Sequence, residues 1–156
     1  RCCRVAWHHP IACPALPTCS KALGEAERVL PQVIDRLEKV LADTGNTGLP
    51  LRLNMTGCPN GCSRPYAAEL GIVGRTKKGY DVYVGGSAAG DRLAKRVRED
   101  VPLDEIPDML RPLLEQFSRD VGADDTTSFG DWAMQLEWAS LLELLPTTTT
   151  RRVRAQ

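Results

Sequence analysis

The sequence has few aromatic residues and no excess of either charge. Phenylalanine, tryptophan and tyrosine make up only 5% of its 156 residues, and 20 lysines and arginines balance 20 aspartates and glutamates. Dedicated nucleic-acid-binding domains usually carry a strong basic excess, so this balance argues against one. No run approaches the roughly 18 apolar residues of a membrane-spanning helix, so we expect no membrane span. The length suits one domain with its own core.

Cysteine is missing from everything after residue 62. The six cysteines are Cys2, Cys3, Cys13, Cys19, Cys58 and Cys62. Small disulfide-stapled domains carry denser cysteine and spread it along the whole chain, so this clustering favours metal ligands over disulfides. Because the chain begins at Arg1 rather than at methionine, we expect residues upstream, and the lack of a signal peptide carries no weight. Localisation therefore rests on the cysteines, which indicate the cytoplasm, or the plastid stroma if the chain is eukaryotic.

Four of the cysteines form two local pairs, in "ACPALPTC" (12–19) and "TGCPNGC" (56–62). In the second pair, Pro59 favours an extended Cys58, while Asn60 and Gly61 tolerate left-handed backbone, so Cys62 can turn back to the same side. Structural zinc sites favour pairs separated by two to four residues, a range that fits the second pair but not the wider first one. Irregularly spaced thiolates suit a [4Fe–4S] cluster at least as well, so the spacing leaves both metals open.

The periodicity of the apolar residues predicts an α/β fold. We expect helices at 24–30, 31–44, 90–100, 103–120 and 128–145, strands at 49–55, 68–74 and 80–86, and a hairpin turn at 75–79. Pro31 should restart the first helix and Gly45 should end it, with Val33, Ile34, Leu37, Val40 and Leu41 on one apolar face. Pro107 suits the start of the 103–120 helix, and Ser128 suits the N-terminal cap of the last helix.

These motifs, in this order, resemble the sirohaem-containing sulfite and nitrite reductases. The resemblance covers roughly residues 12–132 and rests on "ACPALPTC", "EAERVLP" (25–31), "TGCPNGCSRPYAAELGIVG" (56–74), "YDVYVGG" (80–86) and "SFGDW" (128–132). Both branches of the family share the four-cysteine pattern. The "GCSRPYAAELG" continuation favours the sulfite branch, and the match is close for the assimilatory, ferredoxin-dependent type.

The resemblance implies the C-terminal half of such an enzyme, with a mixed sheet and flanking helices. It implies that Cys13, Cys19, Cys58 and Cys62 bind a [4Fe–4S] cluster, and that Cys62 also bridges to the sirohaem iron as its axial ligand. The implied reaction is the six-electron reduction of sulfite to sulfide, with ferredoxin or a similar protein as electron donor. Three alternatives stay open: a nitrite reductase of the same family, a small iron–sulfur carrier without sirohaem, and a zinc-stabilised interaction module.

The sequence also departs from the family. Family members are several times longer, and the missing N-terminal half supplies most of the cationic residues that hold the substrate. Arg64 lies beside the second cysteine pair, and we interpret its side chain as structural packing. Cys2, Cys3, His8 and His9 are metal-ligating residue types, but they lie in an unpatterned end, which argues against a second site. The expected division is a divergent segment at 1–11, a sirohaem/[4Fe–4S]-binding domain at 12–140 and a disordered tail at 141–156.

Two groups of basic residues could steer an acidic electron donor such as ferredoxin. One group, Arg75, Lys77 and Lys78, lies at the predicted hairpin tip, and the other, Arg92, Lys95, Arg96 and Arg98, lies on the predicted 90–100 helix. Acidic residues interrupt the second group, so we interpret these residues as an ordinary solvated surface.

Overall fold

A computed structural model describes residues 10–49, 51–87, 89–121 and 126–146. Its centre is a five-stranded sheet in the order β1 (Ile11–Ala12), β2 (Leu53–Thr56), β3 (Leu70–Gly74), β4 (Gly79–Val84) and β5 (Lys95–Pro102). β1, β2 and β3 are parallel, whereas β3, β4 and β5 are antiparallel. The α/β class and the mixed sheet are confirmed. None of the helices in the described ranges is long and apolar enough to span a membrane.

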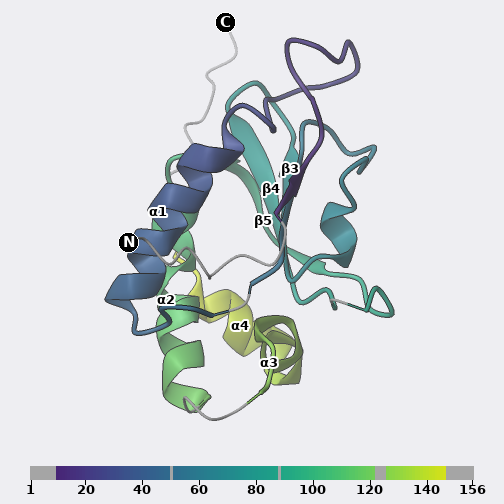
Figure 1. Cartoon of the computed structure of the whole chain (residues 1–156). Helices are drawn as coiled ribbons and strands as arrows, with labels where there is room; N and C mark the ends of the chain where they lie inside the picture. Colours follow the sequence, from purple (N-terminus) through teal and green to yellow (C-terminus); the bar gives the residue numbers. More distant parts are fainter. Residues whose placement is uncertain (1–9, 50, 88, 122–125, 147–156) are drawn as a thin grey trace, which may run out of the picture.

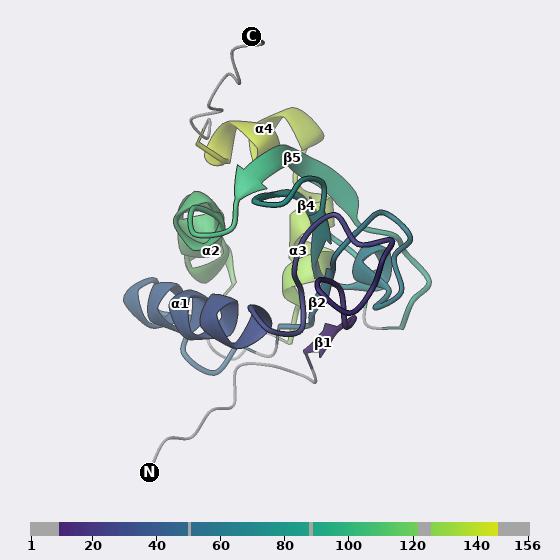
Figure 2. The same cartoon turned by 90° about the horizontal axis from the view of Figure 1, so that it is seen from above.

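Two long helices, α1 (Leu30–Asp43) and α2 (Ile106–Asp120), cover one face of the sheet side by side (Figures 1 and 2). Proline lies in the first turn of each, as expected, and Gly45, with a positive φ of 78°, follows the end of α1. Of the predicted apolar face of α1, Val33, Leu37, Val40 and Leu41 are buried and Ile34 is half-buried. The core therefore lies between this helical layer and the sheet.

The short helix expected at 24–30 does not form, because its backbone makes other bonds. The Gly24 amide donates to the Gly57 carbonyl, and the Glu25 carbonyl accepts from the Tyr80 hydroxyl. This segment consists of bends and turns, and the helix begins only at Leu30. Contacts with distant parts of the chain therefore replace the local helical pattern.

The helix predicted at 90–100 is wrong, because this stretch contributes β5. The buried side chains of β5 are Val97 and Val101, and its charged residues alternate with them at the edge of the sheet. β5 pairs with β4 through an irregular register, in which Asp100 has a positive φ of 51° and its amide donates to the Asp81 carboxylate. Without β5, β4 would expose an unpaired edge, which natural sheets avoid.

The single helix predicted at 128–145 is two helices, α3 (Phe129–Gln135) and α4 (Trp138–Leu144), joined by extended Leu136 and Glu137. Ser128 caps α3, as expected, by accepting from the Asp131 amide at 3.1 Å. The domain boundary expected at residue 140 falls inside α4, whose Leu141 is buried. Residues 147–156 of the expected tail lie outside the described residues, as do Cys2, Cys3, His8 and His9.

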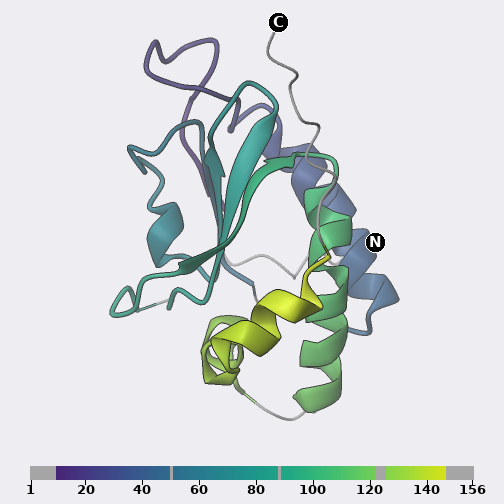
Figure 3. The same ribbon diagram turned by 180° about the vertical axis from the view of Figure 1, so that it is seen from behind.

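The second face of the sheet is polar and carries the short 3₁₀ helix η1 (Pro65–Ala67), opposite α1 and α2 (Figures 1 and 3). Along β2, Leu53 and Met55 join the helix-covered core, whereas the Asn54 side chain bonds the loop before η1. Because successive side chains of a strand point to opposite faces, β2 contributes apolar side chains to the core and a polar side chain to the second face. The segment between β2 and η1, which carries Cys58 and Cys62, leads onto this face.

Candidate metal centre

The two cysteine loops leave the sheet at the same edge. β1 and β2 are parallel, with Ala12 opposite Met55, so Cys13 and Cys58 follow neighbouring carboxyl ends. The Cys13 amide donates to the Met55 carbonyl at 3.2 Å, which continues the pairing past β1. Ligand sites in α/β sheets commonly lie outside such carboxyl ends. Although 43 positions separate Cys13 from Thr56 in the sequence, their side chains are in contact.

Polar groups of the second loop surround the Cys13 sulfur. The Gly57 amide donates to Cys13 Sγ at 3.3 Å, and the hydroxyl of the fully buried Thr56 lies 3.4 Å from the same sulfur. Such donors stabilise a thiolate, and hydrogen bonds to sulfur are one of the ways in which proteins set a cluster's potential. Cys13 is therefore already in an environment that suits a metal ligand.

Gly57 is the point of closest approach between the loops. A Cβ atom at this position would lie 2.5 Å from Ala15 Cβ and 2.6 Å from the Gly24 carbonyl oxygen. The Leu23 and Gly24 amides both donate to the Gly57 carbonyl, at 2.8 and 2.9 Å. Any side chain at position 57 would therefore push the two cysteine loops apart.

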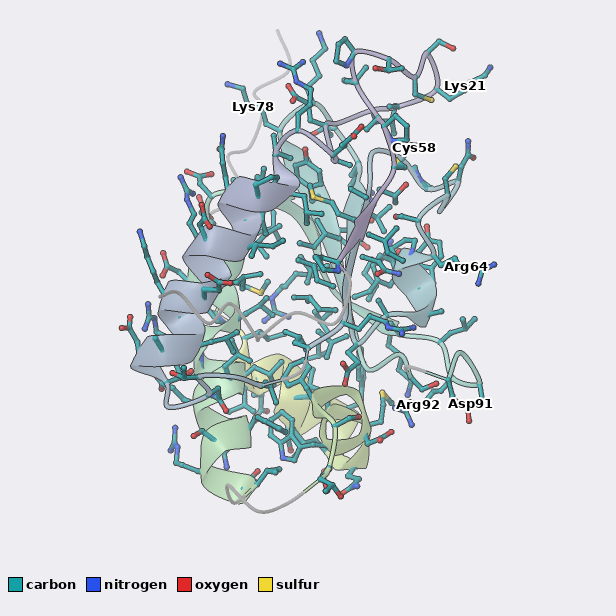
Figure 4. All side chains as sticks on the ribbon, in the orientation of Figure 1. Lys21, Cys58, Arg64, Lys78, Asp91 and Arg92 are labelled. Atoms are coloured by element: carbon teal, nitrogen blue, oxygen red, sulfur yellow. The ribbon has the colours of Figure 1, made fainter. Side chains whose placement is uncertain are left out.

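The second loop presents its two thiols differently. Cys58 is buried, with only 6% of its surface exposed, whereas Cys62 is exposed. Gly61 takes a positive φ of 69°, as the sequence predicted for this turn, and the Arg64 amide closes the turn by donating to the Gly61 carbonyl at 2.8 Å. Cys19, in the first loop, is half-buried and donates its amide to the Ala15 carbonyl. Figure 4 marks Cys58 near the end of the sheet that carries the first loop.

All four of these cysteines are free thiols, so no disulfide joins them. Within the described ranges, no three histidine, cysteine, aspartate or glutamate side chains lie close enough to hold one metal ion. A zinc ion would require all its thiolates at about 2.3 Å from one point. A [4Fe–4S] cluster is ligated by four thiolates and spreads them over several irons. Hydrogen bonds to sulfur, such as that from the Gly57 amide to Cys13 Sγ, are among the features with which proteins tune such a cluster.

Comparison with known protein families settles the family. The family described as "Nitrite and sulphite reductase 4Fe-4S domain" matches residues 8–151. The chain belongs to this family.

Relatives with established names are sulfite reductases. The chain is 49% identical over 124 residues to the sulfite reductase [NADPH] hemoprotein beta-component of Acidithiobacillus ferrooxidans, covering 80% of this chain and 22% of that protein. For the Paenibacillus sp. protein of the same name, the identity is 41% over 125 residues, covering 80% and 21%. The chain thus spans about a fifth of these relatives. Their names specify NADPH, so the ferredoxin-dependent type stays a prediction.

Two solved structures share the fold. The NirA protein of Mycobacterium tuberculosis matches with a TM-score of 0.67 at 23% identity, covering 85% of this chain and 26% of that one. Dissimilatory sulfite reductase I matches with a TM-score of 0.62 at 11% identity, covering 97% and 55%. At these identities the likeness concerns the fold alone, and it agrees with the α/β fold described above.

Within this reductase fold, a polar network that the motifs did not reveal holds the second cysteine loop. Asn54 Nδ2 donates to the Ser63 and Arg64 carbonyls at 2.8 and 3.1 Å, and the Ser63 hydroxyl donates to the Met55 carbonyl at 2.7 Å. The only sequence signal was the alternation along 49–55, which placed Asn54 away from the apolar residues. The network ties the backbone after Cys62 to β2.

Tyr66, in η1, contacts the same turn. Its hydroxyl donates to the Pro59 carbonyl at 2.9 Å. Burial is the main cause that raises the pKa of Tyr66, followed by the charges of Tyr83, Asp81 and Cys58. The phenol therefore stays protonated at neutral pH and keeps donating. Sequence reasoning missed this residue because nothing local distinguishes it from a packing tyrosine.

The interpretation of Arg64 as a packing side chain is wrong. Its side chain is exposed and makes no hydrogen bond or ion pair with the described residues, and Figure 4 shows it pointing away from the sheet. Its backbone carries the structural role instead, with a φ of 54° and a carbonyl that accepts from Asn54. The guanidinium therefore remains available beside the second cysteine loop.

Most of the basic residues outside the loops have structural partners. Arg92 pairs with Asp131 at 2.7 Å, and Arg75 and Arg96 share the buried Asp81 carboxylate at 3.0 and 3.4 Å. Arg98 donates to carbonyls at the end of α4, and burial lowers its pKa. Lys95 lies over the Trp138 ring. At the hairpin tip, Lys77 and Lys78 are exposed without an ion pair in the described structure. Each member of the second basic group thus has an intramolecular partner.

Proposed function

We propose that this chain binds a [4Fe–4S] cluster through Cys13, Cys19, Cys58 and Cys62. The observation that carries this proposal is the meeting of the two cysteine loops at the carboxyl ends of β1 and β2, with the Gly57 amide bonded to Cys13 Sγ. Membership of a family described as a 4Fe-4S domain supports the same cofactor.

In this proposal Cys62 would also hold a sirohaem, in addition to its role as a cluster ligand. Its exposure supports this role, since Cys58 in the same turn is buried and Cys62 is the thiol that a second group can reach. The names of the relatives, which specify hemoproteins, support a haem-type cofactor. The two groups, when bound, supply one-electron redox chemistry. The Arg64 guanidinium, which has no ion pair among the described residues, can bind an anionic group of the sirohaem beside this turn.

The reaction we propose for the complete protein is the six-electron reduction of sulfite to sulfide. This chain's part would be to hold the thiolates in place, with the two cysteine loops kept together at the close approach of Gly57 to Ala15. The cationic residues that hold sulfite belong, in this proposal, to an N-terminal half outside this chain. Nitrite is the second candidate substrate because the family description includes both anions. The names of the relatives favour sulfite.

We propose a cytoplasmic protein that takes electrons from a separate carrier. Ferredoxin is the donor that the motifs implied, whereas the names of the relatives point to a partner that uses NADPH. Supplying the loaded complete enzyme with either donor would separate them. Activity with only one donor identifies the type.

The test of the cofactor proposal is a spectrum of the chain purified without oxygen, together with iron and acid-labile sulfide assays. A bound cluster gives a broad visible shoulder and roughly equal iron and sulfide, at about four of each per chain. Reconstitution with sirohaem should add sharp Soret and long-wavelength bands. A colourless chain that contains stoichiometric zinc would overturn the proposal.

A further inference from the structure

Tyr66 is fixed to the Cys58–Cys62 turn by its hydroxyl and to the sheet by its ring. The hydroxyl donates to the Pro59 carbonyl, inside the turn, at 2.9 Å. The ring meets the Tyr83 ring edge-on, with centroids 5.0 Å apart and an interplanar angle of 78°. Tyr83 lies on β4, so the ring pair connects the turn to the central part of the sheet. Edge-on aromatic pairs of this kind stabilise by more than their buried area.

The ring also lies directly against the residue that reverses the chain. A Cβ atom on Gly61 would be 2.8 Å from Tyr66 Cε2, so the ring and the bare Gly61 backbone are in van der Waals contact. Gly61 has a positive φ, a conformation that glycine adopts without a steric penalty. The Tyr66 carbonyl in turn accepts from the Ala94 amide at 2.7 Å, which holds the tyrosine backbone in place.

From these contacts we propose that Tyr66 is a positioning residue, which fixes the turn so that the Cys58 and Cys62 thiolates keep a set separation and direction. The inference rests on the proposed function, in which both thiolates hold the cluster. Tyr66 makes no hydrogen bond to either sulfur in the described structure, and it acts through the Pro59 carbonyl and the Gly61 backbone. The hydrogen bond from its hydroxyl holds the Pro59 carbonyl in place. The contact of its ring with Gly61 restricts the backbone conformation of the turn.

The first test uses the metal-free chain and measures hydrogen exchange at the Gly61 and Arg64 amides, which close the turn. Tyr66→Phe removes only the hydroxyl and should speed exchange there roughly fivefold, as expected for the loss of one typical hydrogen bond. Tyr83→Phe is the matched control because the Tyr83 hydroxyl has no hydrogen bond to described residues. Exchange at Ile72, in β3, should stay unchanged in both variants. Equal rates in Tyr66→Phe and Tyr83→Phe, or faster exchange everywhere, would overturn the proposal.

The second test uses the cluster-loaded chain and measures its midpoint potential and electron paramagnetic resonance linewidths. Tyr66→Phe should retain iron and sulfide but shift the potential and broaden the signal, whereas Tyr83→Phe should match the unsubstituted chain. Tyr66→Leu, which removes the ring as well, should have the larger effect. Identical spectra and potentials in all four proteins would refute the positioning role. Failure of the unsubstituted chain to assemble a cluster would instead refute the proposed function, and the exchange test would still decide the role of Tyr66.

Discussion

The two faces of the sheet are both buried but are built differently. On β2, Leu53 and Met55 face the helices and are 0% exposed, while Asn54 and Thr56 on the other face are 3% and 0% exposed. Apolar side chains need only a space of suitable size, so many sequences could fill the helix-covered face. Buried polar groups need specific partners, which here are the Ser63 carbonyl for Asn54 and Cys13 Sγ for Thr56. One face therefore provides stability, and the other provides accurate placement of the cysteine loops.

The largest expected effect is the loss of the cluster from the cysteine-bearing face. Replacing Cys13, Cys19 or Cys58 with serine should reduce iron and sulfide to background, because each supplies one of only four thiolates. The fold should persist, since the helix-covered core does not change. Iron and sulfide assays and circular dichroism measure the two properties separately. Cys2→Ser is the matched control and should keep its cluster. A chain that loses the cluster with Cys2→Ser but keeps it with Cys13→Ser would refute the ligand assignment.

Replacing Leu37, on the helix-covered face, with alanine should destabilise the fold without removing a cluster ligand. Leu37 is 0% exposed in the centre of α1, so its truncation leaves a cavity and should lower the free energy of unfolding by about 2–5 kcal/mol. Urea denaturation of the metal-free chain measures this. Leu93, which is 65% exposed, is the control, and Leu93→Ala should change the free energy by less than about 0.5 kcal/mol. A stable Leu37→Ala chain would mean that α1 does not pack on the sheet as described.

Two buried asparagines allow a matched test of the two faces. Asn54 Nδ2 bonds the second cysteine loop, whereas Asn46 Nδ2 bonds the Leu114 carbonyl of α2 at 2.8 Å. Changing either to alanine removes buried hydrogen bonds and should cost about 0.5–1.5 kcal/mol for each bond lost. Only Asn54→Ala should also lower the cluster's retention, measured as iron lost over time without oxygen. Equal iron loss in both variants would show that general destabilisation, rather than the loop, controls the cluster.

The sequence predicted the elements whose signals are local. The stripe from Val33 to Leu41, the turn at 75–79 and the Ser128 cap each depend on residues a few positions apart, and each is confirmed. β5 was mistaken for a helix because its charged residues suit a strand only when β4 is beside them. Strand preference depends on the partner and on the face, and the sequence alone shows neither.

In the candidate site, too, the features that depend on neighbouring residues could be predicted, and those that depend on distant residues could not. The Pro-Asn-Gly turn between Cys58 and Cys62 could be predicted from the backbone preferences of those residues. The contact of Cys13 with Gly57 depends on the parallel pairing of β1 with β2, which no local pattern encodes. The roles of Asn54 and Tyr66 were missed for the same reason, because their partners are defined only by the folded loop.

The smallest expected effect concerns Asp131, at the start of α3. The Arg92 guanidinium and then the Ser128 hydroxyl lower the pKa of Asp131 below its ordinary value of 3.8. A carboxylate whose pKa is lower in the folded state stabilises the fold above its unfolded pKa, and loses this effect as the pH falls through its folded value. Asp131→Asn should therefore be slightly less stable than the unsubstituted chain at pH 7, and the difference should vanish as the pH falls below 3.8. The effect is small because half of the side chain is exposed to screening solvent.

Asp104→Asn, which removes an exposed carboxylate without an ion pair in the described structure, controls for net charge. Urea denaturation across this pH range measures both variants, and a difference that persists at low pH would show that Asp131 acts through its packing rather than its charge.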